Sequence, residues 1–231
     1  MKTVICIGGG DLRDKTTLKI DEYIASLAKA RAGEKRANAL FVPTASHDFM
    51  PYYNTFHKVY TGVFGINTDV TMTVFRQSEP DKLRAKFEKA DMIYVGGGDA
   101  LFMLESWRSS GLIDLIVDAY NRGVIISGLS AGAICWFNDM FTDTSSLGIG
   151  GKYTLQKGLG WFDGLICPHY NFRKCEFDSE TAGYAGLRLA LEDNSAIVIR
   201  DGKIVGSLSC GGTAFSLDKN ICSPVLPSLL D

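Results

Sequence analysis

The sequence contains few residues that could act as a general base near neutral pH, and few that interrupt regular structure. Only three of its 231 residues are histidines and only six are prolines. No proline- or serine-rich linker, low-complexity tract or internal repeat divides the chain. We therefore expect a single domain over residues 1–231, a length that one α/β domain can reach.

Long apolar runs, basic clusters and paired metal-binding cysteines are also missing. The first apolar stretch, residues 3–7, is too short for a signal peptide or a membrane span. The net charge is −2, which argues against nucleic acid as a partner. None of the six cysteines forms a C-x-x-C pair, which argues against a zinc site. We expect a soluble, cytoplasmic protein with reduced thiols and with no metal, cofactor or membrane partner. The sequence leaves the oligomeric state open, a homodimer included.

Short β-branched apolar runs alternate with segments of helical periodicity, which predicts an α/β fold. Such alternation indicates βαβ units in a doubly wound, mostly parallel sheet with helices on both faces. An Asp-Gly pair at 201–202 predicts a small antiparallel hairpin near the C-terminus. The predicted strands are residues 3–7, 39–42, 70–75, 92–95, 124–127, 165–167, 196–199 and 204–208, and the predicted helices are residues 18–28, 83–90, 101–108, 112–120 and 181–192. Residues 139–164 form the longest stretch without periodicity.

The sequence Gly-Leu-Ser-Ala-Gly at residues 128–132 follows a predicted strand and precedes a helix-forming run. This is the nucleophile-elbow pattern, in which small neighbours let a sharp turn present a serine. A serine that only caps a helix is the alternative. A catalytic Ser130 needs a base and oxyanion donors elsewhere in the chain.

His169 is the favoured base among the three histidines. It follows a predicted buried strand, so it should lie at the strand ends where α/β proteins bind ligands. His47 also follows a strand, and His57 falls in a further helix-like segment at residues 52–60; both suit loop or surface roles better.

An acidic residue should orient the imidazole, and we expect it between Ser130 and His169. Asp143 stands at the start of the irregular stretch and is the first candidate, with Asp139 second. Asp163 directly precedes the histidine strand and should lie at its other end. A helix cap or loop role would explain either of the first two acids.

A second glycine-rich turn, Gly-Gly-Gly-Asp at residues 96–99, also follows a strand and precedes a helix. It lacks the spacing of a nucleotide-binding loop. We expect the Gly98 and Ala131 N–H groups to form an oxyanion hole for the carbonyl that Ser130 attacks. Three further glycines, residues 8–10, suggest close backbone contact at the end of the first strand.

The sequence resembles the dipeptidase E-like serine peptidases, which include cyanophycinases and have a fold related to class I glutamine amidotransferases. The resemblance extends to about residue 212, and the matching pieces are residues 7–10, 40–46, 94–98, 128–133 and 167–169. It implies that Ser130 is the nucleophile, His169 the base, and Gly98 and Ala131 the oxyanion donors. It also implies an acid shortly after the elbow helix and release of N-terminal aspartate from short peptides.

Two departures from the family pattern bear on the substrate. Asp99 stands where the family usually has asparagine, and its carboxylate could repel an acidic substrate. Ala182 stands where aspartate-specific members carry an arginine, and Arg173 or Lys174 could supply that charge instead. The sequence predicts a serine exopeptidase or dipeptidase acting on short peptides. An esterase or amidase with the same triad and an inactive small-molecule sensor are the alternatives.

Overall fold

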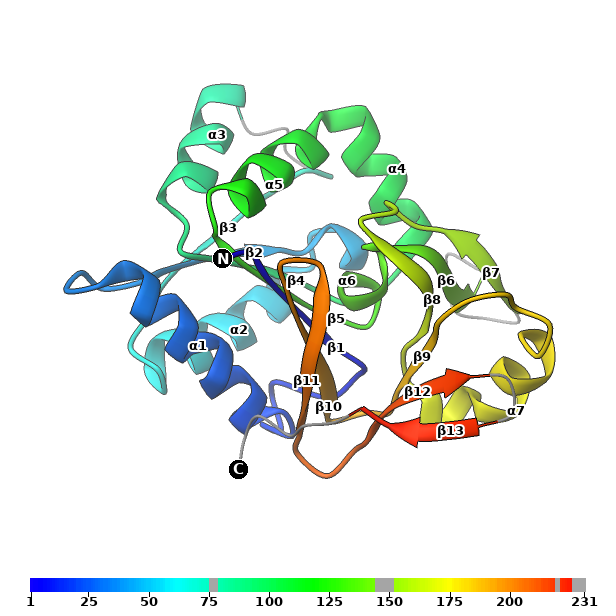
Figure 1. Cartoon of the computed structure of the whole chain (residues 1–231). Coiled ribbons are helices and arrows are strands. Elements are labelled where there is room, and N and C mark those ends of the chain that lie inside the picture. The colour runs from blue at the N-terminus through cyan, green and yellow to red at the C-terminus, as the bar shows by residue number, and fades with distance from the viewer. Residues whose placement is uncertain (75–78, 144–151, 219–220, 226–231) are drawn as a thin grey trace.

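The structure is a computed structural model that describes residues 1–74, 79–143, 152–218 and 221–225. Within these residues the chain forms two β-sheets that lie side by side (Figure 1). Helices cover both faces of the first sheet, and a further helix packs against the second sheet. The fold is therefore α/β, as the alternating pattern predicts.

The first sheet has a parallel centre and an antiparallel edge. Its strand order is β11-β10-β1-β5-β4-β2-β3, in which only β10 and β11 run antiparallel to their neighbours. The expected parallel sheet and the hairpin at Asp201 and Gly202 are both present. The strands are β1 (Thr3–Ile7), β2 (Asn38–Val42), β3 (Asn67–Val70), β4 (Met92–Val95), β5 (Ile125–Leu129), β10 (Ser195–Arg200) and β11 (Lys203–Ser209).

Alternate residues of the parallel strands enter two separate apolar clusters. On β1, Val4 and Cys6 join the cluster beneath α3, α4 and α5, whereas Ile5 and Ile7 join the cluster beneath α1 and α2. In Figure 1 the two groups of helices lie above and below the sheet. Burial on both faces explains why these strands read as continuous apolar runs. The helices are α1 (Leu18–Ala32), α2 (Met50–Gly62), α3 (Pro80–Lys89), α4 (Ala100–Ser110) and α5 (Leu112–Asn121).

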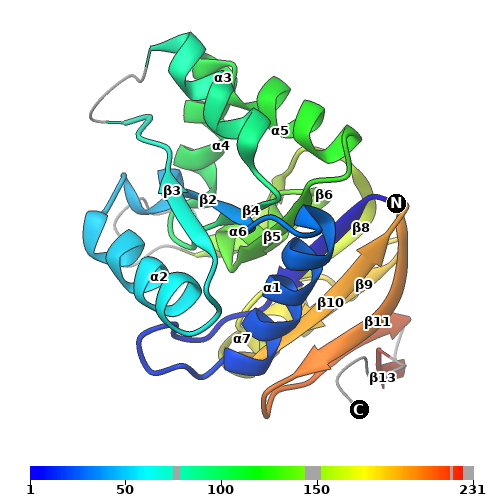
Figure 2. The same cartoon turned by 90° about the vertical axis from the view of Figure 1, so that its left-hand side faces the viewer.

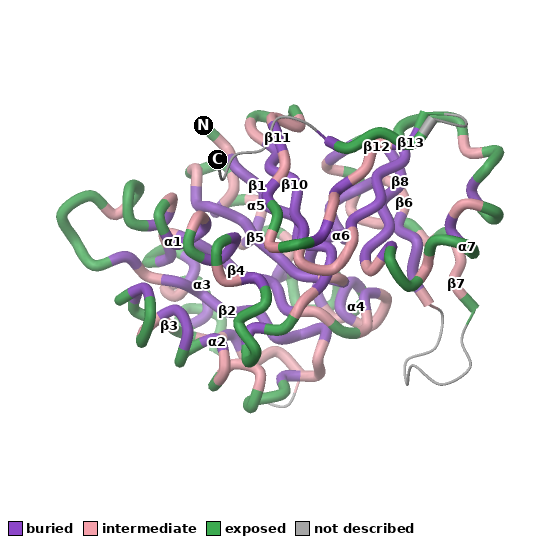
Figure 3. The backbone as a smooth tube through the Cα atoms, turned by 90° about the horizontal axis from the view of Figure 1, so that it is seen from below, coloured by how far each residue is buried: buried purple, intermediate pink, exposed green. Residues whose placement is uncertain are grey.

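The second sheet, with strand order β13-β12-β9-β8-β6-β7, has no counterpart in the sequence-based fold. One of its faces, with Phe137 and Leu189, joins the α3–α5 cluster, and the other, with Leu165, packs against Phe177 of α7. Figure 2 shows it beyond β10, and Figure 3 shows buried segments running through the strands of both sheets. Its elements are β6 (Phe137–Asp143), β7 (Tyr153–Lys157), β8 (Phe162–Cys167), β9 (Arg188–Leu191), β12 (Ala214–Asp218), β13 (Ile221–Pro224) and α7 (Tyr170–Glu180).

Three sequence-based assignments are wrong in detail. The helix expected at residues 181–192 is instead a turn and loop after α7, followed by strand β9, whose four residues are all buried. A short apolar run buried on two faces cannot be told from a helix by periodicity. The strand expected at residues 70–75 pairs only at Asn67–Val70, and Phe75 lies outside the described residues. The irregular stretch at 139–164 contains most of β6, β7 and the start of β8, although residues 144–151 also lie outside the described part.

Candidate active site

Ser130 stands on a strained turn between β5 and the short helix α6 (Ala131–Ile134). Its backbone has φ 52° and ψ −111°, which a non-glycine residue rarely adopts and which costs about 1–3 kcal/mol. The flanking glycines are required sterically. A Cβ at Gly128 would overlap the Gly132 carbonyl, and a Cβ at Gly132 would overlap the Val95 carbonyl. The local geometry is therefore that of a nucleophile elbow.

The imidazole of His169 lies directly against the Ser130 hydroxyl. His169 follows β8 in the left-handed conformation, with φ 52°, and its Nε2 is 2.8 Å from Ser130 Oγ. The structure thus joins two groups that are 39 residues apart in the sequence. The other histidines lie elsewhere: the His47 ring packs against the Phe102 ring, and His57 Nδ1 is 2.6 Å from Thr68 Oγ1.

Asp193 is the acidic partner of the histidine. Its Oδ1 is 2.6 Å from His169 Nδ1, and each side chain is about one quarter exposed. Asp193 lies in the turn between β9 and β10. Its own N–H donates to Asn171 Oδ1 at 3.0 Å, and the next N–H, of Asn194, donates to Gly9 O at 2.9 Å. These backbone anchors fix the carboxylate beside the imidazole.

The acids expected from the sequence do not occupy this position. Asp139 accepts hydrogen bonds from Lys157 Nζ at 2.7 Å and Tyr184 Oη at 2.8 Å, on the β6–β7 side of the second sheet. Asp143 is the last residue of β6, opposite Tyr153 of β7. The expectation of an acid between Ser130 and His169 is corrected to Asp193. Asp193 was missed because residues 181–192 were expected to be a helix. They contain a strand, β9, that runs parallel to β8, so the residues that follow the two strands lie at the same edge of the sheet.

The first glycine-rich turn, residues 8–10, packs against the histidine–aspartate pair. The His169 N–H donates to Gly8 O at 3.1 Å, and the Ser130 N–H donates to Ile7 O at 2.9 Å. A Cβ at Gly9 would overlap both Asp193 Oδ1 and His169 Nδ1. Only glycine at this position leaves room for the pair, which gives the predicted close backbone contact a specific purpose.

The second glycine-rich turn approaches the elbow from the other side. A Cβ at Gly97 would lie 3.3 Å from Ser130 Cβ, so the two turns are in contact. Gly98 is exposed, has φ 140°, and has no room for a Cβ because of the Ala45 carbonyl. Ala131 opens α6, and the first N–H groups of a helix have no partner within it. Of the two predicted oxyanion donors, Ala131 thus directly follows Ser130 in the chain, and Gly98 directly follows Gly97, the residue of the turn that approaches Ser130.

Asp99 and Arg173, the predicted substrate-binding residues, have structural partners. Asp99 is the N-cap of α4, where its Oδ1 accepts the Phe102 N–H at 2.9 Å. Aspartate and asparagine cap helices equally well, which explains how aspartate fits this turn. The Arg173 guanidinium donates to Phe141 O at 3.3 Å and lies 4.5 Å from the Tyr153 ring centroid, so it ties α7 to the second sheet.

The structure also contains a fully buried carboxyl group. Asp21 of α1 is fully buried and accepts hydrogen bonds from Thr17 Oγ1 at 2.7 Å and Tyr60 Oη at 2.9 Å. Burial raises the pKa of Asp21 to about 7, although both hydrogen bonds act in the opposite direction. The carboxyl group therefore changes charge near neutral pH.

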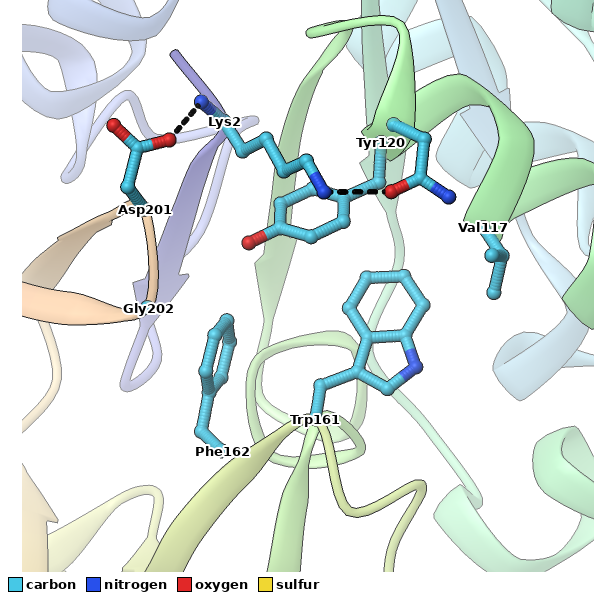
Figure 4. A pocket seen from close by; sticks show the side chains of 8 residues that line it. Lys2, Val117, Tyr120, Trp161, Phe162, Asp201 and Gly202 are labelled. Carbon is cyan, nitrogen blue, oxygen red and sulfur yellow. Dashed lines mark hydrogen bonds between the residues drawn. The ribbon is translucent and has the colours of Figure 1, made fainter.

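A cavity of about 500 Å³ lies at the opposite end of the first sheet (Figure 4). Tyr120 and Trp161 stack in its wall at 4.9 Å, and Lys2 Nζ donates to Asn121 Oδ1 at 2.7 Å. Lys2 precedes β1, whereas the turn under His169 follows it, so the length of a five-residue strand, roughly 17 Å, separates the two places. This cavity is not part of the Ser130 site.

The described residues contain no group of three or more His, Cys, Asp or Glu side chains placed to hold a metal ion. None of their helices is long and apolar enough to cross a membrane.

The chain belongs to a class of hydrolases, the peptidases. The model of peptidase family S51 matches residues 4–206, so the chain is a member of that family. It is 33% identical over 175 residues to the uncharacterized peptidase YgaJ of Bacillus subtilis (strain 168), covering 75% of this chain and 71% of that protein. It is 30% identical over 125 residues to peptidase E of Haemophilus influenzae, covering 53% and 56%.

Solved structures confirm the fold. A crystal structure of a peptidase from an acI-B1 Actinobacterium superposes with a TM-score of 0.73 at 16% identity and covers 99% of this chain and 95% of that one. A putative peptidase E protein from Listeria monocytogenes EGD-e gives a TM-score of 0.65 at 20% identity, covering 89% and 97%.

Proposed function

We propose that this peptidase is a serine peptidase whose catalytic triad is Ser130, His169 and Asp193. One observation carries the proposal: the hydroxyl, imidazole and carboxylate form a continuous chain with contacts of 2.8 Å and 2.6 Å. In such a chain the carboxylate fixes the tautomer in which Nδ1 carries the proton. Nε2 is then free to accept the proton of the serine.

The proposed reaction is acyl transfer to water. Ser130 attacks the peptide carbonyl while His169 Nε2 takes its proton, and Asp193 stabilises the resulting imidazolium. The Gly98 and Ala131 N–H groups hold the oxyanion, an effect of about 3 kcal/mol per donor in the best-measured serine peptidase. His169 then protonates the leaving amine, and water, activated by the same imidazole, hydrolyses the acyl-enzyme.

The proposed substrates are short peptides cleaved by an exopeptidase or dipeptidase action. The support is membership of the peptidase family and similarity to relatives named peptidase E. A preference for N-terminal aspartate has weaker support, because Ala182 replaces the expected arginine and Arg173 is engaged by Phe141 and Tyr153.

All six cysteines are unpaired, which supports action in the reducing cytoplasm.

Labelling with a fluorophosphonate tests the nucleophile directly. We expect the probe to modify Ser130, and expect Ser130→Ala and His169→Ala to lose both labelling and peptide hydrolysis. Absence of labelling in the folded wild-type protein would instead favour the inactive sensor.

The acid is tested with matched variants that each replace one carboxylate. Asp193→Asn should lower kcat by about 10⁴-fold, as the same change of the triad acid does in a well-studied serine peptidase. Asp143→Asn and Asp139→Asn should leave kcat within about threefold of wild type, because neither side chain contacts His169. The reverse ranking would refute the assignment.

A dipeptide library assayed beside simple acyl esters separates the remaining substrate classes. Hydrolysis of dipeptides supports the peptidase, even if the intrinsically more reactive esters are turned over faster. Turnover confined to esters or non-peptide amides would support the alternative hydrolase. Comparing Asp-X with other dipeptides decides the aspartate preference.

A further inference from the structure

Tyr52, in the first turn of α2, lies against the glycine turn that follows β4. Its ring packs edge-on to Phe41 at 5.0 Å. A Cβ at Gly96 would come within 2.9 Å of Tyr52 Cε1, so the ring lies over the Gly96 backbone. The side chain is therefore held between the sheet and the turn, with little freedom to rotate.

The hydroxyl of Tyr52 makes a polar contact with the same turn. The Gly97 N–H donates to Tyr52 Oη at 3.3 Å. Gly97 in turn touches the elbow, because a Cβ there would be 3.3 Å from both Ser130 Cβ and Leu129 O. Tyr52 is thus one peptide unit away from the nucleophile.

This hydrogen bond bears on which N–H of the turn a substrate can meet. The Gly97 N–H is occupied by Tyr52, while the next residue, Gly98, is exposed with φ 140°. Fixing the Gly97 peptide fixes the direction of the chain that enters Gly98. Removal of the hydroxyl would leave the Gly97 N–H without its partner and let the turn rotate.

We propose that Tyr52 is a positioning residue that holds the Gly97 peptide and so directs the Gly98 N–H at the oxyanion. This inference rests on the proposed serine peptidase function. It gives Tyr52 no contact with the reacting atoms, since it acts through Gly97. Burial, together with the charges of Asp21 and Asp11, raises the pKa of Tyr52 to about 12, and the hydrogen bond from Gly97 lowers it. The phenol therefore stays neutral across the working pH range.

The neighbouring Tyr53 provides a matched control. Its hydroxyl is 3.3 Å from Thr68 O, and its ring also contacts Phe41, at 6.2 Å. Tyr52→Phe and Tyr53→Phe each remove one oxygen from adjacent residues of the same helix. Only the first change removes a contact with the glycine turn.

The kinetic experiment compares kcat, KM and the affinity for a peptide aldehyde, which forms a tetrahedral adduct with the serine. Tyr52→Phe should lower kcat by about 10- to 100-fold, less than or equal to the loss of a whole oxyanion donor. KM should change less than twofold, and the affinity for the aldehyde should fall by the same factor as kcat. The ratio of the variant's kcat to that of the wild type should not vary between pH 6 and 9. Tyr53→Phe should be within twofold throughout.

A wild-type kcat in Tyr52→Phe, a loss expressed only in KM, or an equal loss in Tyr53→Phe would overturn the proposal. A second measurement is independent of activity: in the Ser130→Ala background, Tyr52→Phe should shift the Gly97 amide resonance and speed its hydrogen exchange at least tenfold. An unchanged Gly97 amide would also overturn it. If Ser130→Ala remained active, the proposed function would fail, and the amide measurement would still decide whether Tyr52 holds the turn.

Discussion

Replacing Gly9 by alanine is the sharpest test of the histidine–aspartate pair. The backbone of Gly9 does not have a positive φ, so alanine brings little conformational strain there. The added methyl would overlap Asp193 Oδ1 and His169 Nδ1, the two atoms that form the 2.6 Å contact. One carbon atom thus perturbs the pair without altering any group that takes part in proton transfer.

The size of the effect follows from the geometry. Restoring an ordinary carbon–heteroatom separation of about 3.5 Å requires the pair to move by on the order of 1 Å. A displacement of that size at a reacting group costs about 10²-fold in rate. Forcing a methyl into a filled site should also lower the free energy of unfolding by about 1–3 kcal/mol.

The assay measures kcat and KM on the best dipeptide substrate, with urea titrations to confirm folding. Gly183→Ala is the control, because a Cβ there meets nothing within 4 Å. In an Asp193→Ala background, Gly9→Ala should cost clearly less than it does in the wild type, because the overlap with Asp193 is gone and only the overlap with His169 remains. A wild-type rate for Gly9→Ala, or a full 10²-fold loss in both backgrounds, would refute the reasoning.

Two further predictions concern carboxyl groups away from the triad. Between about pH 4 and pH 7 folded Asp21 retains a proton that the unfolded chain has released, so its contribution to stability falls as pH rises through this window. Compared with Asp21→Asn in urea titrations, the wild type should lose up to about 4 kcal/mol of relative stability from pH 4 to pH 8; parallel pH profiles would contradict this. Asp99→Ala should lower the free energy of unfolding by about 1 kcal/mol through loss of the α4 cap, whereas Asp99→Asn should stay within about 0.3 kcal/mol. Equal losses in both variants, measured by thermal unfolding, would show that the cap is not the reason.

The fold was predictable where burial leaves a simple pattern. Strands β1 and β4 match their predicted bounds, because each is a short apolar run covered by helices on both faces. The second sheet was not predictable, since β9 reads Arg-Leu-Ala-Leu, a composition that also suits a helix. Its strands are specified by pairing with distant segments such as β8 and β12, which no local window of sequence contains.

The candidate site was also predictable only in part. Ser130 and His169 each follow a recognisable strand, and the expectation that they meet agrees with the 2.8 Å contact. The two strands belong to different sheets, however, so the contact depends on how the sheets dock and not on one shared strand edge. Asp193 was missed because its strand was taken for a helix. The contact between Gly9 and the triad could not be derived either, since it depends on where the second sheet docks against the end of β1.

The proposed catalytic groups come from both sheets. Ser130 follows β5 of the first sheet, His169 follows β8 of the second, and Asp193 lies where the chain crosses from one sheet to the other. A small sliding of one sheet over the other would separate nucleophile from base while every strand kept its own hydrogen bonds. Enzymatic rate should accordingly vanish under milder denaturing conditions than those needed to abolish the circular dichroism of the backbone.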